Sequence, residues 1–338
     1  MTAHLALQSI LGLAPVCLFL GSLLYIDSYK LVRLGRILQL IAAGGLAAAL
    51  SYAVNRKILE IDLVGHGTLT QFAAPAVEEA LKLVPLLLLF RARRIGFVID
   101  AAICGFACGA GFAVVENLYY LSAVSGRGLA FWVVRGFGTA VMHGGTTAIA
   151  AMLMKALFQR RESTSILLAT PGFAAAFTIH ALFNQFILSP LVSAVAVMAL
   201  LPPLIVMVFA LSERHLQRWL GSGFDLDAEL IRAIRSSDFA SSRPGRYLQE
   251  LRDRFDGPVV ADMLCYLRLY SELSLRAKGI LMLRENGLPV PHAPETRGKL
   301  AELQYLKAAI GQTGQLALAP LLHRTSHDVW QLQLLEEV

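Results

Sequence analysis

Seven apolar segments, each long enough to cross a lipid bilayer as a helix, constrain this 338-residue chain more than any other feature. A spanning helix needs roughly 20 apolar residues, and its backbone groups must be hydrogen-bonded within the segment because hydrocarbon offers no partners. With 56% hydrophobic and 16% charged residues, the chain is also too apolar for an ordinary soluble protein. The sequence therefore predicts an all-α polytopic membrane protein with about seven transmembrane helices, at residues 5–25, 35–54, 70–90, 97–121, 130–157, 165–188 and 191–212.

The distribution of charge predicts the orientation of these spans. Residues 1–212 hold 14 Lys and Arg against 8 Asp and Glu, whereas residues 213–338 hold 16 of each, so the net charge of +6 belongs to the apolar half. There it reports topology, and no nucleic-acid partner is expected. Nine basic residues flank the first, third and fifth loops, against three in the alternate loops. We therefore expect an integral protein of the cell (plasma) membrane with its N-terminus outside and its C-terminus in the cytoplasm.

The two ends of the chain carry further expectations. The first apolar segment lacks a basic start and is longer than a typical signal-peptide core, so we interpret it as a retained span. Beyond residue 212, apolar residues recur at spacings of three and four with charges between them, which is typical of amphipathic helices. The sequence thus predicts a membrane domain at 1–212 and a cytoplasmic helical domain at 213–338, whose role is unknown and which could bind a cytoplasmic partner.

Four consecutive predicted spans contain polar groups that lipid-embedded segments normally avoid. An ionisable side chain at the centre of a span costs about 2.5–3.5 kcal/mol even on the lenient insertion scale, so such residues usually face the bundle interior and mark function. Counted along each helix from its outer end, all four features lie between the outer half and the middle of the bilayer, where they can meet in one pocket. They are Glu78, Glu79 and Lys82, then Glu116 and Asn117, then His143, and finally His180 and Asn184.

Carboxylates and imidazoles are the ligands of zinc-type ions, and a glutamate beside a bound water is a common general base for hydrolysis. Proton pathways and cation sites use the same residue types, and a buried ion pair or interhelical hydrogen bonds would also account for them. Cys104 and Cys108 share a face with Glu116 and are alternative ligands, although packing explains them as well. The residues alone leave these readings open.

The four motifs EEALK at 78–82, FAVVENLYY at 112–120, MHGGTTA at 142–148 and HALFN at 180–184 together resemble those of the PrsW family of intramembrane proteases. That family is related to CAAX-type prenyl proteases and to bacteriocin-processing membrane proteins. The resemblance covers about residues 70–190 and implies an endopeptidase that cleaves a membrane-anchored protein, such as an anti-sigma factor or another single-span protein. The CAAX-type enzymes have the pattern EExxxR and a histidine at the position of Glu116, so which glutamate is the base does not transfer.

The resemblance makes Glu78 and Glu79 the acidic pair, Glu116 and His143 further polar members of the site, and His180 with Asn184 the last motif. Our mechanistic hypothesis is that one glutamate of the pair activates water, while Glu116, His143 and His180 bind a divalent metal, zinc being the first choice. In this hypothesis Asn184 helps to hold the oxyanion, and Lys82 orients or neutralises Glu78. A metal-free mechanism, with glutamate and histidine as base and His180 and Asn184 as oxyanion donors, is the main variant. A non-proteolytic membrane scaffold or immunity protein of the same superfamily and a proton- or cation-coupled transporter are the alternative functions.

Overall fold

The computed structural model describes residues 2–124, 126–161, 163–185, 187–291, 293–322 and 326–336. These residues form helices joined by short turns, and no strand occurs among them, which confirms the predicted all-α class. The chain divides into two compact units, residues 1–213 and 214–338.

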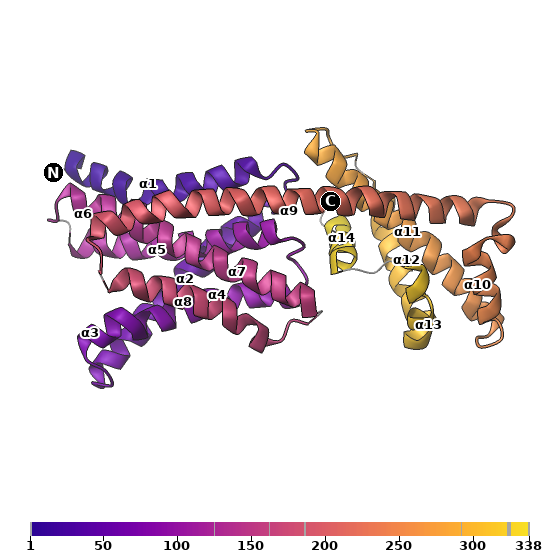
Figure 1. The fold of residues 1–338 in the computed structure, drawn as a ribbon, viewed down its shortest axis with the longest axis horizontal. Helices are drawn as coiled ribbons and strands as arrows, with labels where there is room; N and C mark the ends of the chain where they lie inside the picture. Colours follow the sequence, from indigo (N-terminus) through magenta and orange to yellow (C-terminus); the bar gives the residue numbers. More distant parts are fainter. Residues whose placement is uncertain are drawn as a thin grey trace. The chain divides into compact units, whose positions relative to one another are not determined.

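The first unit consists of long helices joined by short helical turns (Figure 1). Two of these turns are π-helical and lead directly into longer helices. The elements are α1 (Thr2–Ile26), α2 (Leu34–Glu60), α3 (His66–Thr68), the π-helix η1 (Leu69–Ala73), α4 (Ala74–Arg91), α5 (Val98–Ala123), α6 (Leu129–Val133), the π-helix η2 (Val134–Ala140), α7 (Val141–Arg161), the 3₁₀-helix η3 (Ile166–Ala169), α8 (Thr170–Asn184) and α9 (Pro190–Arg235).

Six helical segments of the described chain are long and apolar enough to cross a membrane, which supports a polytopic protein. The predicted span at 70–90 is not one of them, so the count of seven is not confirmed. Its helix, α4, carries four charged residues, Glu78, Glu79, Lys82 and Arg91, which is more charge than a lipid-exposed span of this length normally holds. The six segments are His4–Ile26, Leu34–Glu60, Val98–Ala123, Leu129–Arg161, Ile166–Asn184 and Pro190–Arg235.

Helix α5 forms the centre of the first unit and packs against α7, α2 and α1. It is buried from Ile99 to Ala113. Its N-terminus is held by Asp100, whose Oδ2 accepts hydrogen bonds from the backbone N–H groups of Gly96 and Phe97, at 2.9 and 3.1 Å. Small residues let its backbone lie against its neighbours, as is common where membrane helices meet. At Gly109 an added Cβ would lie 2.3 Å from the carbonyl oxygen of His143, so α5 and α7 approach closely beside this histidine.

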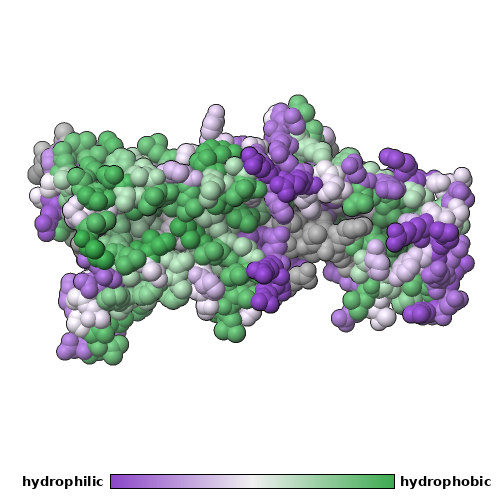
Figure 2. Space-filling model, viewed as in Figure 1, coloured by the Kyte–Doolittle hydropathy of each residue, from purple (hydrophilic) through white to green (hydrophobic). Residues whose placement is uncertain are grey.

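The outer surface of the first unit is apolar, as lipid contact requires. Large hydrophobic side chains are exposed on it, among them Leu18, Leu46 and Leu200. Figure 2 shows hydrophobic side chains over most of the visible face of this unit. The polar residues named from the sequence lie instead on α4, α5, α7 and α8, which pack together inside the unit.

The second unit holds the end of α9 and further helices, with its own buried core. An internal polar contact joins them: Asp227 on α9 accepts hydrogen bonds from Ser274 and, at 2.6 Å, from Lys278, both on α11. The placement of this unit in the cytoplasm stays a prediction. Its further elements are α10 (Arg243–Leu251), α11 (Gly257–Glu285), α12 (Glu295–Ala309), α13 (Gly311–Ala317) and α14 (Ser326–Glu336), with the 3₁₀ turns η4 (Phe239–Ser241) and η5 (Ala319–Leu321).

Candidate active site

Glu79 and Lys82 form a buried ion pair at the centre of the site. Both side chains are fully buried, and the Lys82 Nζ lies 2.6 Å from the Glu79 Oε1. The same oxygen lies 2.8 Å from the Nδ1 of His180 and 3.5 Å from the hydroxyl of Thr146. The other oxygen of Glu79 is buried and has no hydrogen-bond partner among the described residues. A charge removed from water needs such partners, so Glu79 is fixed in place by three elements at once.

The direct partner of Lys82 differs from the predicted one. The sequence places Lys82 and Glu78 on one helical face, four residues apart, and predicts that Lys82 orients or neutralises Glu78. In the structure the Lys82 ammonium contacts Glu79, three residues before it on α4. Positions three and four apart are both neighbours on a helix, and the choice falls to the fully buried carboxylate, which has no access to water.

His180 lies between the two glutamates of α4. Its Nδ1 faces Glu79, while its Nε2 lies 3.8 Å from the Oε2 of Glu78. Because the carboxylate of Glu79 binds Nδ1–H, the free lone pair of the imidazole is on Nε2, on the side of Glu78. The side chain of Glu78 is 15% exposed, whereas that of Glu79 is fully buried. Glu78 therefore faces the accessible side of the site and Glu79 the interior.

His143 has a partner on each ring nitrogen. Its Nδ1 lies 3.1 Å from the Nζ of Lys82, and its Nε2 lies 3.1 Å from the Oε2 of Glu116. Since an ammonium group can only donate, Nδ1 accepts and Nε2 carries the proton given to Glu116. The ring also stands edge-on to that of His180, with 4.7 Å between centroids. The two predicted histidines and the glutamates therefore meet, from the four helices α4, α5, α7 and α8.

Glu116 and Asn184 lie at the edges of this group. The Glu116 side chain is 24% exposed, and its Oε2 lies 3.0 Å from the Nη2 of Arg135. The amide of Asn184 donates to the backbone carbonyl of Thr70 in η1, at 3.1 Å. Among the described residues no hydrogen bond joins Asn184 to the glutamates or histidines. Sequence reasoning did not single out Thr146, although it follows His143 by three positions and so shares its helical face.

One set of side chains has the geometry of a metal site. Glu78, His143 and His180 each offer a ligand atom, and these atoms lie within 4.8 Å of one another. Two of the three ligands predicted from the sequence are in this set, and Glu78 takes the place that the prediction gave to Glu116. One carboxylate and two imidazoles are a common zinc donor set, and a carboxylate behind a ligating imidazole, as Glu79 stands behind His180, is its usual support.

The charges of the site also fit a cation. Three carboxylates, on Glu78, Glu79 and Glu116, face the ammonium of Lys82 and the guanidinium of Arg135, so the acidic groups are in excess. The fit is better at His180 than at His143, because ligation by His143 requires either Glu116 or Lys82 to give up its present contact. The residues present therefore fit a divalent metal held by Glu78, His143 and His180.

Comparison with protein families identifies the family of this chain. The model of the PrsW family of intramembrane metalloproteases matches residues 31–212, more than half of the chain. The chain belongs to the PrsW family. This confirms the resemblance drawn from the four motifs, all of which lie within the matched range. Comparison with curated proteins found no significant match, and comparison with solved structures found none either.

Membership of the PrsW family has several direct consequences. The protein is a membrane protease, integral to a lipid bilayer and acting on a membrane protein. Neither the scaffold nor the transporter alternative is favoured. The match includes α2 to α8 and ends within α9, so α1 and the second unit lie outside it.

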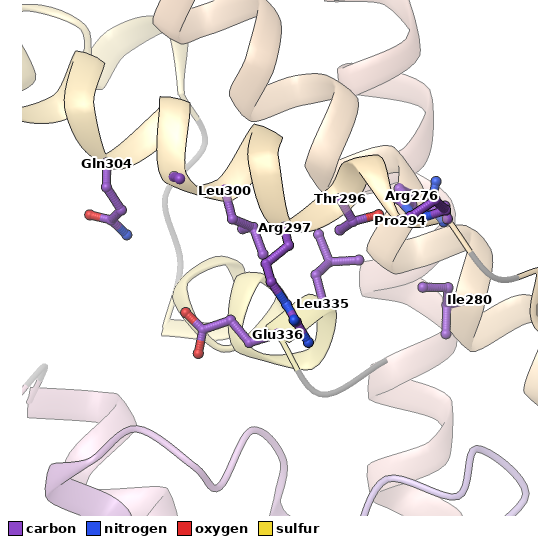
Figure 3. Close-up of a pocket in the computed structure, with 11 residues that line it drawn as sticks. Arg276, Ile280, Pro294, Thr296, Arg297, Leu300, Gln304, Leu335 and Glu336 are labelled. Carbon is purple, nitrogen blue, oxygen red and sulfur yellow. The ribbon is translucent and has the colours of Figure 1, made fainter.

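A hollow lies within the second unit, between α11, α12 and α14 (Figure 3). Its volume is about 510 Å³. The charged groups that line it are Arg276, Arg297 and Glu336, and the described residues of its lining include no histidine or cysteine. The family match and the Glu78, His143 and His180 group both lie in the first unit.

Proposed function

We propose that this PrsW-family protease is an endopeptidase that hydrolyses a peptide bond in a single-span, membrane-anchored protein, and that it depends on a divalent metal, zinc in the first place. The observation that carries the proposal is the grouping of Glu78, His143 and His180 around one point, with Glu79 behind His180.

The proposed roles follow from exposure and from partners. Glu78, His143 and His180 hold the metal, which would act as a Lewis acid and lower the pKa of a bound water. Glu79 is fully buried with three partners, so its proposed role is to hold His180 with Nε2 free. Glu116 is the more exposed carboxylate, and we assign it the transfer of the proton from water to the leaving amine.

Asn184 keeps its proposed role as an oxyanion donor. It follows His180 by one helical turn, and its amide nitrogen carries two hydrogens, only one of which is used in the bond to Thr70. In the metal-free variant, Glu78 is the base, and His180 can hold its carboxylate only when Nε2 also carries a proton, that is, as an imidazolium. The distance of 3.8 Å between Glu78 and His180 and the partial exposure of Glu78 favour this glutamate over Glu79 in that variant.

The test uses the purified full-length protein and a single-span model substrate, assayed with and without a chelator, with bound metal measured by elemental analysis. We expect Glu78→Gln and His180→Ala to lose both metal and cleavage. We expect Glu116→Gln to keep the metal and to lose about 10²–10⁴-fold in kcat, the usual contribution of a general base. Glu60→Gln is the matched control, since Glu60 is exposed on α2 and pairs only with Arg56 and Lys57 among the described residues.

Two results would contradict parts of the proposal separately. If the Glu78, Glu116 and His180 variants all cleave at the wild-type rate, the peptidase site is wrong. If cleavage persists after complete removal of metal, the metal is not required and the variant with Glu78 as base takes its place. In that case Glu78→Gln abolishes cleavage, whereas Glu116→Gln retains it.

A further inference from the structure

Arg135 is held in one orientation by three contacts on α5. It lies in the π-helical turn η2 and is 8% exposed. Its Nε donates to the Oδ1 of Asn117 at 2.7 Å, its Nη2 lies 3.0 Å from the Oε2 of Glu116, and its guanidinium carbon lies 3.8 Å from the ring centroid of Tyr120. The contact with Glu116 is an ion pair without hydrogen-bond geometry, since Nη2 has no hydrogen-bond partner among the described residues. A planar guanidinium can make all three contacts at once, and an ammonium cannot.

The amide of Asn117 connects this arginine to α1. Its Nδ2 donates to the backbone carbonyl of Gly12 at 2.7 Å, so one amide side chain links α1 with Arg135. Two other contacts hold α1 in the same place. The Nε2 of Gln8, which is 1% exposed, donates to the carbonyl of Arg127 at 3.0 Å. At Gly136, the residue after Arg135, the backbone lies so close to Leu11 that a Cβ there would overlap its carbonyl oxygen.

These contacts form a continuous path to the site: Gly12 on α1, Asn117 on α5, Arg135 in η2, Glu116 on α5 and His143 on α7. Glu116 is only partly buried and has two partners, Arg135 and His143. Without the guanidinium, the carboxylate would keep a single contact at 3.1 Å and could turn toward solvent. Arg135 therefore sets the position of Glu116 and, through it, the ring of His143.

We propose that Arg135 is a positioning residue for Glu116 and that α1, which lies outside the family match, is a structural part of the active site through Asn117. The proposal rests on the proposed peptidase function. An arginine that instead binds a carboxylate of the substrate would act on KM, whereas a positioning residue acts on kcat.

The test is a comparison of kcat and KM for full-length variants at equal folded concentration, checked by gel filtration and by Tm. We expect Arg135→Lys and Arg135→Gln to lower kcat about 10–100-fold, the range for a supporting partner of a site residue, with KM changed less than about twofold. Arg135→Lys keeps the charge and much of the volume, so it carries the test if Arg135→Gln does not fold. Arg127→Gln, at an exposed arginine near the same turn, should leave kcat unchanged.

A double-mutant cycle tests the path to Glu116. In the Glu116→Gln background, which has no carboxylate to position, Arg135→Gln should change the remaining kcat less than about twofold. Gly136→Ala should push α1 away and lower kcat, whereas Gly21→Ala, with open space around the added methyl group, should not.

The results that would contradict the proposed role of Arg135 can be told apart from a failure of the peptidase function. A rise in KM at constant kcat would make Arg135 a substrate contact and overturn the proposal. So would full kcat in the folded Arg135 variants, or an undiminished effect of Arg135→Gln in the Glu116→Gln background. If the wild-type protein cleaves and only these predictions fail, the peptidase function stands, whereas a wild-type protein without activity removes both.

Discussion

Alanine at Gly109 is the most direct test of the close packing that places His143. The added Cβ would lie 2.3 Å from the carbonyl oxygen of His143 and 2.8 Å from the Cα of Gly144, whereas ordinary contact begins at 3.4 Å. Both neighbours are backbone atoms, so no side chain can turn aside. Helices α5 and α7 must then separate locally by the difference between 2.3 and 3.4 Å, about 1.1 Å.

A separation of this size acts on catalysis more than on stability. The contact between His143 and Glu116 is already 3.1 Å long, near the upper limit for an N–H···O hydrogen bond, so even half of the displacement breaks it. A misplacement of about 1 Å can cost about 10²-fold in rate. Overpacking costs about 1–3 kcal/mol, and the higher helix propensity of alanine returns up to about 1 kcal/mol of that.

The assay measures kcat for cleavage of a single-span substrate together with Tm in the same detergent. We expect Gly109→Ala to lower kcat about 100-fold while the protein stays folded at the assay temperature. Gly21→Ala is the matched control, because nothing lies within 4 Å of the added methyl group. Activity of Gly109→Ala within twofold of wild type, with an unchanged Tm, would refute the claim that this contact sets the position of His143.

Two further predictions concern the second unit. Partial burial raises the pKa of the Glu272 carboxyl, but hydrogen bonds from Arg268 and Arg235 outweigh it, so the pKa lies below its usual 4.5. A carboxyl whose pKa is lowered by folding stabilises the folded state at pH values above its ordinary pKa, and this stabilisation is lost as the pH falls through the lowered pKa. Because the group is close to solvent, Glu272→Gln should lower the free energy of unfolding in denaturant by up to about 1 kcal/mol at pH 7. In acid the free energies of unfolding of the two proteins should become equal. A difference that persists at pH 2 would contradict this account. Cys265 is exposed, so in a Cys17→Ser background an impermeant maleimide should label it in inverted vesicles and not in intact cells; the reverse pattern would place this unit outside.

The helical class, the polytopic character and the family could all be predicted from the sequence. Apolar length is a local property, so the long spans follow from it directly. The span at 70–90 shows the limit of this reasoning, since the charges that mark α4 as functional also make it unlike a lipid-facing helix. Charge inside an apolar run indicates a site, and it weakens the signal by which a span is counted.

The site residues were also visible in the sequence, but their pairing was not. Glu79, His143 and His180 stand out because ionisable groups are costly in four consecutive apolar segments. Which groups touch depends on how each helix is rotated about its axis and on rotamer choice, and residue spacing within one helix determines neither. Two contacts depend on rotation and rotamer in this way: Lys82 contacts Glu79 rather than Glu78, and Asn184 donates to the carbonyl of Thr70.

The sequence by itself therefore determined that this chain is a helical membrane protein with a buried Glu and His site, and that it is a PrsW-family protease. Only the tertiary structure showed that Glu78 lies with the two histidines and that Glu79 contacts Lys82 and His180. It also showed that Arg135 contacts Glu116 and that α1 is linked to Arg135 through Asn117. The physical reason is that burial cost is a property of each residue, whereas the partner that offsets it comes from another helix. Which partner that is depends on close backbone contacts such as those at Gly109 and Gly136.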